Sequence, residues 1–94
     1  MAVYVVTWNL NKEKSNYSQA RSAFIQHLEQ LDNIGDSGLE SVRWVSTTST
    51  AAALSDYLRQ KLDQNDRLFV SKVNAGERSG WLVQAVWKWI EART

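Results

Sequence analysis

The spacing of apolar residues changes twice within the stretch Ser41–Val73, and this change predicts a strand, a helix and a second strand. Val42–Ser46 is β-branched and aromatic, as strands commonly are. After it come leucines at every fourth position, which is typical of one face of a helix: Leu54, Leu58 and Leu62. After a polar turn, Leu68–Val70 resumes an extended pattern. A helix between two strands is a crossover connection, and its leucines must be buried against a sheet.

The segment before this unit also alternates between strands and helices. Ala2–Leu10 is a nearly continuous apolar run, which is typical of a central strand buried on both faces, or on one face and in a dimer contact. Tyr17–Leu31 has apolar residues at spacings of three and four, which predicts a helix. Asp32–Glu40 contains two glycines and three acidic residues, and it predicts a turn with a short strand around Ile34 or Leu39.

Two patterns fit the tail segment Trp81–Arg93. Pairs of apolar residues recur at helical spacing, whereas single apolar residues also alternate as they do in a strand. We favour the helix, because Gln84 and Lys88 are good helix formers and a strand so apolar would be an aggregation-prone free edge. Val83 and Trp87 lie off the helical stripe. This helix is therefore expected to contact both its own sheet and a neighbouring molecule.

The predicted order is strand, helix, weak strand, strand, helix, strand, helix. Two split crossover units that share one antiparallel sheet give an α+β, ferredoxin-like βαββαβ sandwich with a C-terminal helix. We expect one domain over residues 1–94. The first strand is expected to lie centrally, beside the third and the fourth.

Composition narrows the class of protein. A hydrophobic content of 44% favours a folded domain, and five tryptophans in 94 residues suggest that some lie at a subunit interface or a binding surface. A net charge of +1 gives no general attraction to nucleic acid, so such binding needs a local patch. The chain has no Cys, which excludes disulfide and thiolate chemistry. The first apolar run has no basic leader and is too short to span a membrane, so we expect a soluble, cytoplasmic protein.

Polar residues gather just beyond the end of the first predicted strand, where Asn9 is followed by Lys12 and Lys14. Together with the same residues of a second copy, these side chains could hold a metal or a phosphate. Alternatively, Asn9 satisfies backbone groups of the loop and both lysines are solvated. On the residues alone we favour this structural interpretation.

Two other features have both a functional and a structural interpretation. Ser46–Thr50 is a run of hydroxyl residues at the start of a helix, where it suits either an anion or a helix cap. His27 lies beside the apolar stripe of its helix with no visible catalytic partner, so we interpret it as a boundary residue. A single His also excludes a His-pair metal site within one chain, although not across a dimer.

Three segments carry a resemblance to a known family: VYVVTWNLNKE, RWVSTTS and LDQNDRLFVSKV. They resemble the small CRISPR-associated ferredoxin-like nucleases, whose relatives include the VapD-type ribonuclease toxins, and more closely a branch of short SinR-family proteins. The likeness spans most of the chain. It implies a ferredoxin-like homodimer and, if the protein is catalytic, Mg²⁺-dependent cleavage of RNA at a site shared by two first-strand ends.

The resemblance assigns two catalytic positions. The metal-binding Asp of the family falls on Asn9, and its Ser at the end of the third strand falls on Ser46. A neutral amide holds Mg²⁺ poorly, because hard cations prefer carboxylate oxygen. Asp66 and Arg67 match the opening of the fourth strand and are expected to be structural.

Three functions remain in view. The preferred one is a non-catalytic or weakly active nucleic-acid-binding homodimer, in which Lys12, Lys14 and Arg43 contact phosphates of RNA or DNA and exposed Trp side chains stack on bases or bind a partner. The first alternative is a metal-dependent endoribonuclease, against which Asn9 stands. The second is a structural or small-molecule-binding dimer joined through the Trp-rich tail helix.

Overall fold

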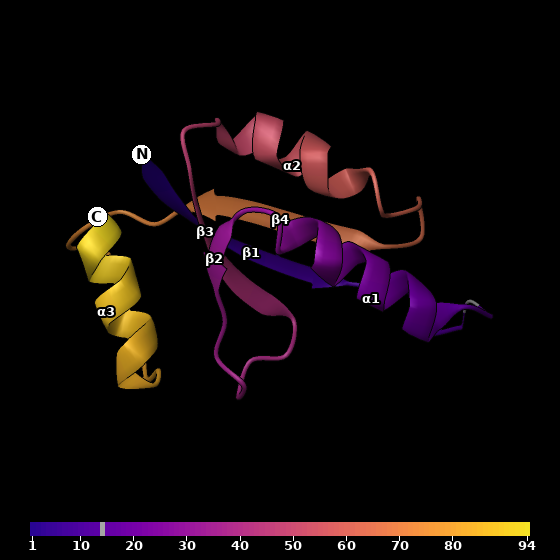
Figure 1. Cartoon of the computed structure of the whole chain (residues 1–94), viewed down its shortest axis with the longest axis horizontal. Helices are drawn as coiled ribbons and strands as arrows, with labels where there is room; N and C mark the ends of the chain where they lie inside the picture. Colours follow the sequence, from indigo (N-terminus) through magenta and orange to yellow (C-terminus); the bar gives the residue numbers. More distant parts are fainter. Residues whose placement is uncertain (14) are drawn as a thin grey trace.

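The computed structural model describes residues 1–13 and 15–94. Its elements follow one another as shown in Figure 1: β1 (Ala2–Asn9), α1 (Tyr17–Leu28), β2 (Asp32–Ile34), β3 (Val42–Thr47), α2 (Ala51–Arg59), β4 (Arg67–Lys72) and α3 (Gln84–Arg93). The strands form one sheet in the order β2-β3-β1-β4, and every neighbouring pair is antiparallel. The predicted ferredoxin-like arrangement with a C-terminal helix is confirmed, including the central position of β1 between β3 and β4.

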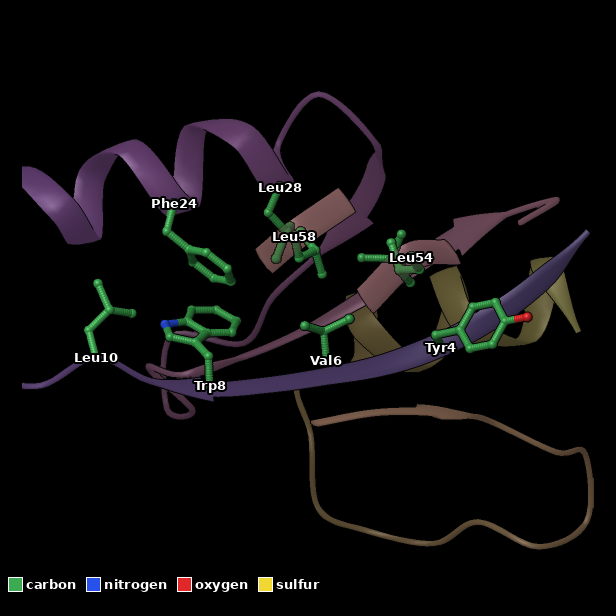
Figure 2. Close-up of a cluster of buried hydrophobic side chains, with 9 residues drawn as sticks. Tyr4, Val6, Trp8, Leu10, Phe24, Leu28, Leu54 and Leu58 are labelled. Carbon is green, nitrogen blue, oxygen red and sulfur yellow. The ribbon is translucent and has the colours of Figure 1, made fainter. Parts of the chain in front are cut away.

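One face of the sheet, here called the helix face, carries Tyr4, Val6 and Trp8 of β1 and is covered by α1 and α2. Figure 2 shows Trp8 pointing from β1 toward Phe24, and Val6 pointing toward the leucines of the two helices. The rings of Trp8 and Phe24 lie 5.0 Å apart between centroids. Successive side chains of a strand point to opposite faces, so the even-numbered residues of β1 build this core.

The opposite side, here called the tail face, carries the odd-numbered residues of β1 and is partly covered by α3. Val86 and Ile90 of α3 pack on Val3 and Trp44 in a second buried cluster. The helix α3 therefore packs on its own sheet, which is one of the two contacts predicted for it. The other predicted contact, with a neighbouring molecule, stays a prediction. Burial on both faces explains why β1 reads as a nearly continuous apolar run.

Polar contacts also hold the tail segment against the rest of the chain. The backbone N–H of Val83 donates to Asp36 Oδ2 at 3.0 Å, and Arg93 Nε lies 2.9 Å from Asp32 Oδ2 in an ion pair. The guanidinium of Arg93 also lies 4.1 Å above the ring of Trp89. Both acidic partners belong to β2 or to the loop that follows it, so this end of the sheet anchors α3.

Some predicted element ends are wrong. The helix predicted to reach Leu31 ends at Leu28. Beyond it the chain tightens into hydrogen bonds between residues three apart, such as that from the Leu31 N–H to the Leu28 carbonyl at 3.0 Å. The tail helix starts at Gln84 instead of Trp81, after an extended Val83. The short strand lies at Ile34, one of its two predicted positions, and Leu39 lies outside it because its N–H donates to the Asp36 carbonyl in a tight turn. Among the described residues no helix combines the length and the apolar character needed to cross a bilayer.

Candidate nucleic-acid interface

The tail face has an uncovered part beyond the reach of α3. It consists of Thr7 and Asn9 on β1, which lie directly opposite Phe69 and Arg67 on β4. We call these four residues the open strip. The ring of Phe69 is 63% exposed although its strand lies next to the central strand of the sheet. A shallow hollow of about 200 Å³ lies along the same residues.

Hydrogen bonds to backbone carbonyls hold the side chain of Arg67 in place and do not neutralise its charge. Its Nη1 donates to the carbonyl oxygens of Gln64 at 3.2 Å and of Asp66 at 2.9 Å. Carbonyl oxygens orient a guanidinium but leave its full positive charge available to an anion. The guanidinium of Arg67 is therefore an ordered cation, and Arg67 lines the same hollow as the exposed Phe69.

Asp66 ties together the two loops at this end of the molecule. Its carboxylate is only 7% exposed and accepts the backbone N–H groups of Asn11 at 2.9 Å and Asp63 at 3.0 Å. The first of these bonds holds the loop after β1 against the turn before β4. Lys12 follows Asn11 in this loop and is exposed. These two bonds agree with the structural role expected of Asp66.

The residues at the end of β1 do not fit a divalent cation. Asn9 is exposed and carries a neutral amide, and the residue opposite it across the strands is the cation Arg67. In residues 1–13 and 15–94 no three Asp, Glu, His or Cys side chains gather into a group that could hold a metal ion. The predicted contact Lys14 lies outside the described residues.

The second predicted catalytic residue, Ser46, lies far from Asn9 within the protomer. It is buried on the tail face opposite Val3 of β1, and its hydroxyl donates to the sulfur of Met1 at 3.8 Å. Asn9 lies six positions after Val3 along β1, a distance of roughly 20 Å along an extended strand. One protomer therefore does not bring Asn9 and Ser46 into a common site.

Arg43, a predicted phosphate contact, lies on the other face of the sheet. It is opposite Val6, and its Nη1 contacts Glu29 Oε2 at 3.1 Å and Asn33 Oδ1 at 2.9 Å. Its side chain crosses so close to Gly35 that a Cβ there would lie 2.7 Å from Arg43 Cδ. The charge of Arg43 is paired with a carboxylate, and the residue is not part of the open strip.

The hydroxyl run at the start of α2 has structural partners. Thr50 is the N-cap, and its Oγ1 accepts the N–H of Ala53 at 3.1 Å. Thr47 Oγ1 accepts the N–H of Ser49, and the Tyr4 hydroxyl donates to the Ser49 carbonyl at 2.9 Å. These contacts agree with the capping interpretation of Ser46–Thr50.

His27 joins α1 to α2. Its Nε2 donates to the Tyr57 carbonyl at 2.8 Å, since a carbonyl oxygen only accepts, and the Tyr57 hydroxyl donates back to the His27 carbonyl at 2.8 Å. The two rings are stacked with centroids 3.8 Å apart. The contacts of His27 are those of a structural residue.

Phe69, Arg67 and Thr7 were not among the site residues predicted from sequence. A signal exists in the alternation along β4, where Leu68 and Val70 pack into the core of the helix face and Phe69 must then point to the other side. The position of α3, which decides whether that other side is covered, could not be read from the sequence.

Comparisons with known proteins, made against family models, curated proteins and solved structures, found no match to this chain.

Proposed function

We propose that this protein is a non-catalytic nucleic-acid-binding module that holds a single-stranded segment of RNA or DNA on the open strip. The observation that carries the proposal is the exposed ring of Phe69 on an open sheet face, with the ordered cation Arg67 two residues away on the same face. Exposed aromatic rings beside cations are the usual means by which proteins bind single strands.

Each residue of the strip suits a different part of a nucleotide. The Phe69 ring offers a surface for one base, and base–aromatic stacking contributes about 1–3 kcal/mol. Arg67, and the exposed Lys12 in the loop after β1, suit the flanking phosphates. Thr7 and Asn9 carry a hydroxyl and an amide that can bond to base edges. A single strand fits best, because only unpaired bases can be laid flat on a ring.

Binding is favoured over cleavage by the chemistry of the residues at this end of the sheet. The amide of Asn9 cannot act as a general acid or base, and the hydroxyl of Ser46 is buried at the other end of the strand. Net charge gives little long-range attraction, so affinity must come from the strip itself.

The test is a fluorescence-anisotropy titration of labelled 20-nucleotide RNA and DNA strands and of the matching duplexes, in chelator and at two salt concentrations. We expect the single strands to bind more tightly than the duplexes, binding to weaken with salt, and no strand to be cut when Mg²⁺ is added. Phe69→Ser is expected to weaken binding about tenfold or more, which corresponds to about 1.4 kcal/mol.

The matched control is Trp81→Ser, because Trp81 is 99% exposed but lies outside the open strip, and the proposal assigns to Phe69 the stacking expected of exposed Trp side chains. This control should bind as the wild type does. Equal losses from Trp81→Ser and Phe69→Ser, or Mg²⁺-dependent cleavage of the RNA, would overturn the proposal.

A further inference from the structure

β4 forms an outer edge of the sheet, and its backbone groups alternate between β1 and solvent. The Val73 N–H donates to the Val3 carbonyl at 2.8 Å, in the same register that pairs β4 with β1. Bonded and non-bonded pairs alternate along an antiparallel ladder, so Arg67, Phe69 and Ser71 also bond to β1. The N–H and C=O groups of the residues between them point outward: Leu68, Val70 and Lys72.

This edge has little of the protection that edge strands usually have, since its charged residues, Arg67 and Lys72, stand only at its two ends. It is six residues long, whereas β2 at the other edge has three, and the chain contains no Pro. Among the described residues, Leu68, Val70 and Lys72 take part in no backbone hydrogen bond outside the sheet. The largely exposed ring of Phe69 lies in the same strand. An open ladder with an exposed aromatic side chain is suited to pairing with another strand.

We propose that β4 pairs antiparallel with β4 of a second copy, about a two-fold axis at Val70, and joins two four-stranded sheets into one of eight. In this register Val70 faces its own counterpart, and Leu68 faces the partner's Lys72. All three outward-pointing residues of each strand then form bonded pairs. The inference does not depend on nucleic-acid binding.

The side chains of β4 are complementary to themselves in this register. Phe69 lies opposite the partner's Ser71, and the two Phe69 rings are diagonal neighbours, which aromatic side chains can bridge. Arg67 lies opposite the partner's Val73, so no like charges face each other directly. A shift by one residue would place Arg67 opposite the partner's Lys72 and would set outward groups against inward ones.

The first test is the mass in solution, by sedimentation equilibrium. The wild type is expected at twice the 10.7 kDa of one chain. Val70→Pro is expected at the mass of one chain, because Pro removes an N–H that points outward and leaves the ladder to β1 intact. Trp81→Ser, which changes an exposed aromatic outside β4, should keep the mass of the wild type. A monomeric wild type, or a dimeric Val70→Pro, would overturn the pairing.

The second test uses a single cysteine, which can form a disulfide only between copies because the chain has none of its own. Facing residues of a bonded pair have Cα atoms about 5.5 Å apart, a separation that a disulfide spans. Val70→Cys is expected to form a covalent dimer on mild oxidation, at least tenfold faster than Trp81→Cys. Equal rates would contradict an axis at Val70.

The two proposals can fail separately. Val70→Pro is expected to become a monomer but to keep the open strip, so each chain should still bind a single strand. Arg67→Gln is expected to weaken nucleic-acid binding while leaving the mass unchanged. A loss of nucleic-acid binding in Arg67→Gln alone therefore says nothing against the dimer.

Discussion

Single residues fasten the tail segment to the sheet, and Asp36 is the clearest example. Its carboxylate accepts the N–H groups of Val83 at 3.0 Å and of Gly38 at 2.8 Å. These two bonds, the one from Val83 above all, lower the pKa of Asp36 below its ordinary value of 3.8. The ionised form of Asp36 thus stabilises the contact between the β2–β3 loop and the start of α3.

This contact makes the attachment of α3 sensitive to acid. Because the pKa is lowered in the folded state, the stabilisation is complete above pH 3.8 and is lost as the pH falls through the folded-state pKa. We expect tryptophan fluorescence to report loosening of Trp87 and Trp89 in that acidic range. In Asp36→Asn the acid-induced change should be smaller, since residue 36 no longer titrates. An unchanged acid transition in this variant would show that Asp36 does not control it.

A second residue-scale prediction concerns the reciprocal bonds between α1 and α2. Tyr57→Phe removes the hydroxyl that donates to the His27 carbonyl. The free energy of unfolding is expected to fall by about 1 kcal/mol, as for a typical hydrogen bond, and nucleic-acid affinity should not change. Urea denaturation and the anisotropy titration measure these two quantities. A variant as stable as the wild type would mean that this bond contributes nothing net.

The candidate site was only partly predictable at this scale. Asn9 and Lys12 follow an apolar strand, and this order already suggests an exposed polar end. The isolation of Ser46 and the pairing of Arg43 with Glu29 depend on strand register and on loop packing. Neither leaves a local pattern in the sequence.

At the scale of elements, α3 is held by the buried side chains on one of its faces. Ile90 is 1% exposed and packs with Val86 against Trp44. Ile90→Ala is expected to lower the free energy of unfolding by about 2–3 kcal/mol, toward the low end for such a substitution because α3 covers only part of the sheet. Emission from Trp44 should also shift to longer wavelength as water reaches it.

Glu91→Ala on the exposed side of α3 is the matched control and should change stability by less than about 0.5 kcal/mol. Urea denaturation compares the two variants. Equal effects from Ile90→Ala and Glu91→Ala would contradict the docking of α3 on the tail face.

The elements themselves were predictable because their periodicities are strong. Leucines at helical spacing identified α2, although the helix ends at Arg59 and Leu62 lies beyond it. The choice of a helix for the tail was correct. Element ends were less predictable, since they are decided by individual bonds. Asp36 is an example, because its bonds close the turn after β2 and engage the N–H of Val83 just before α3.

At the scale of the whole molecule, the fold leaves the tail face of the sheet only partly covered. The helix face is closed by α1 and α2, whereas the ten residues of α3 cover only part of the tail face (Figure 1). The open strip lies on the part of the tail face that α3 does not cover. The order of the elements predicted this sheet, but the extent of cover by α3 depends on how the linker from Val73 to Val83 runs, which no pattern in the sequence specifies.

The most direct measurement of the central claim is an NMR titration of the isotope-labelled protein with a short single strand. Chemical-shift changes are expected to concentrate on residues 7–12 and 66–70, around Thr7, Asn9, Arg67 and Phe69, with little change on α1 and α2. Changes centred on Arg43 and the helix face, or no change at saturating concentrations of the strand, would contradict the claim.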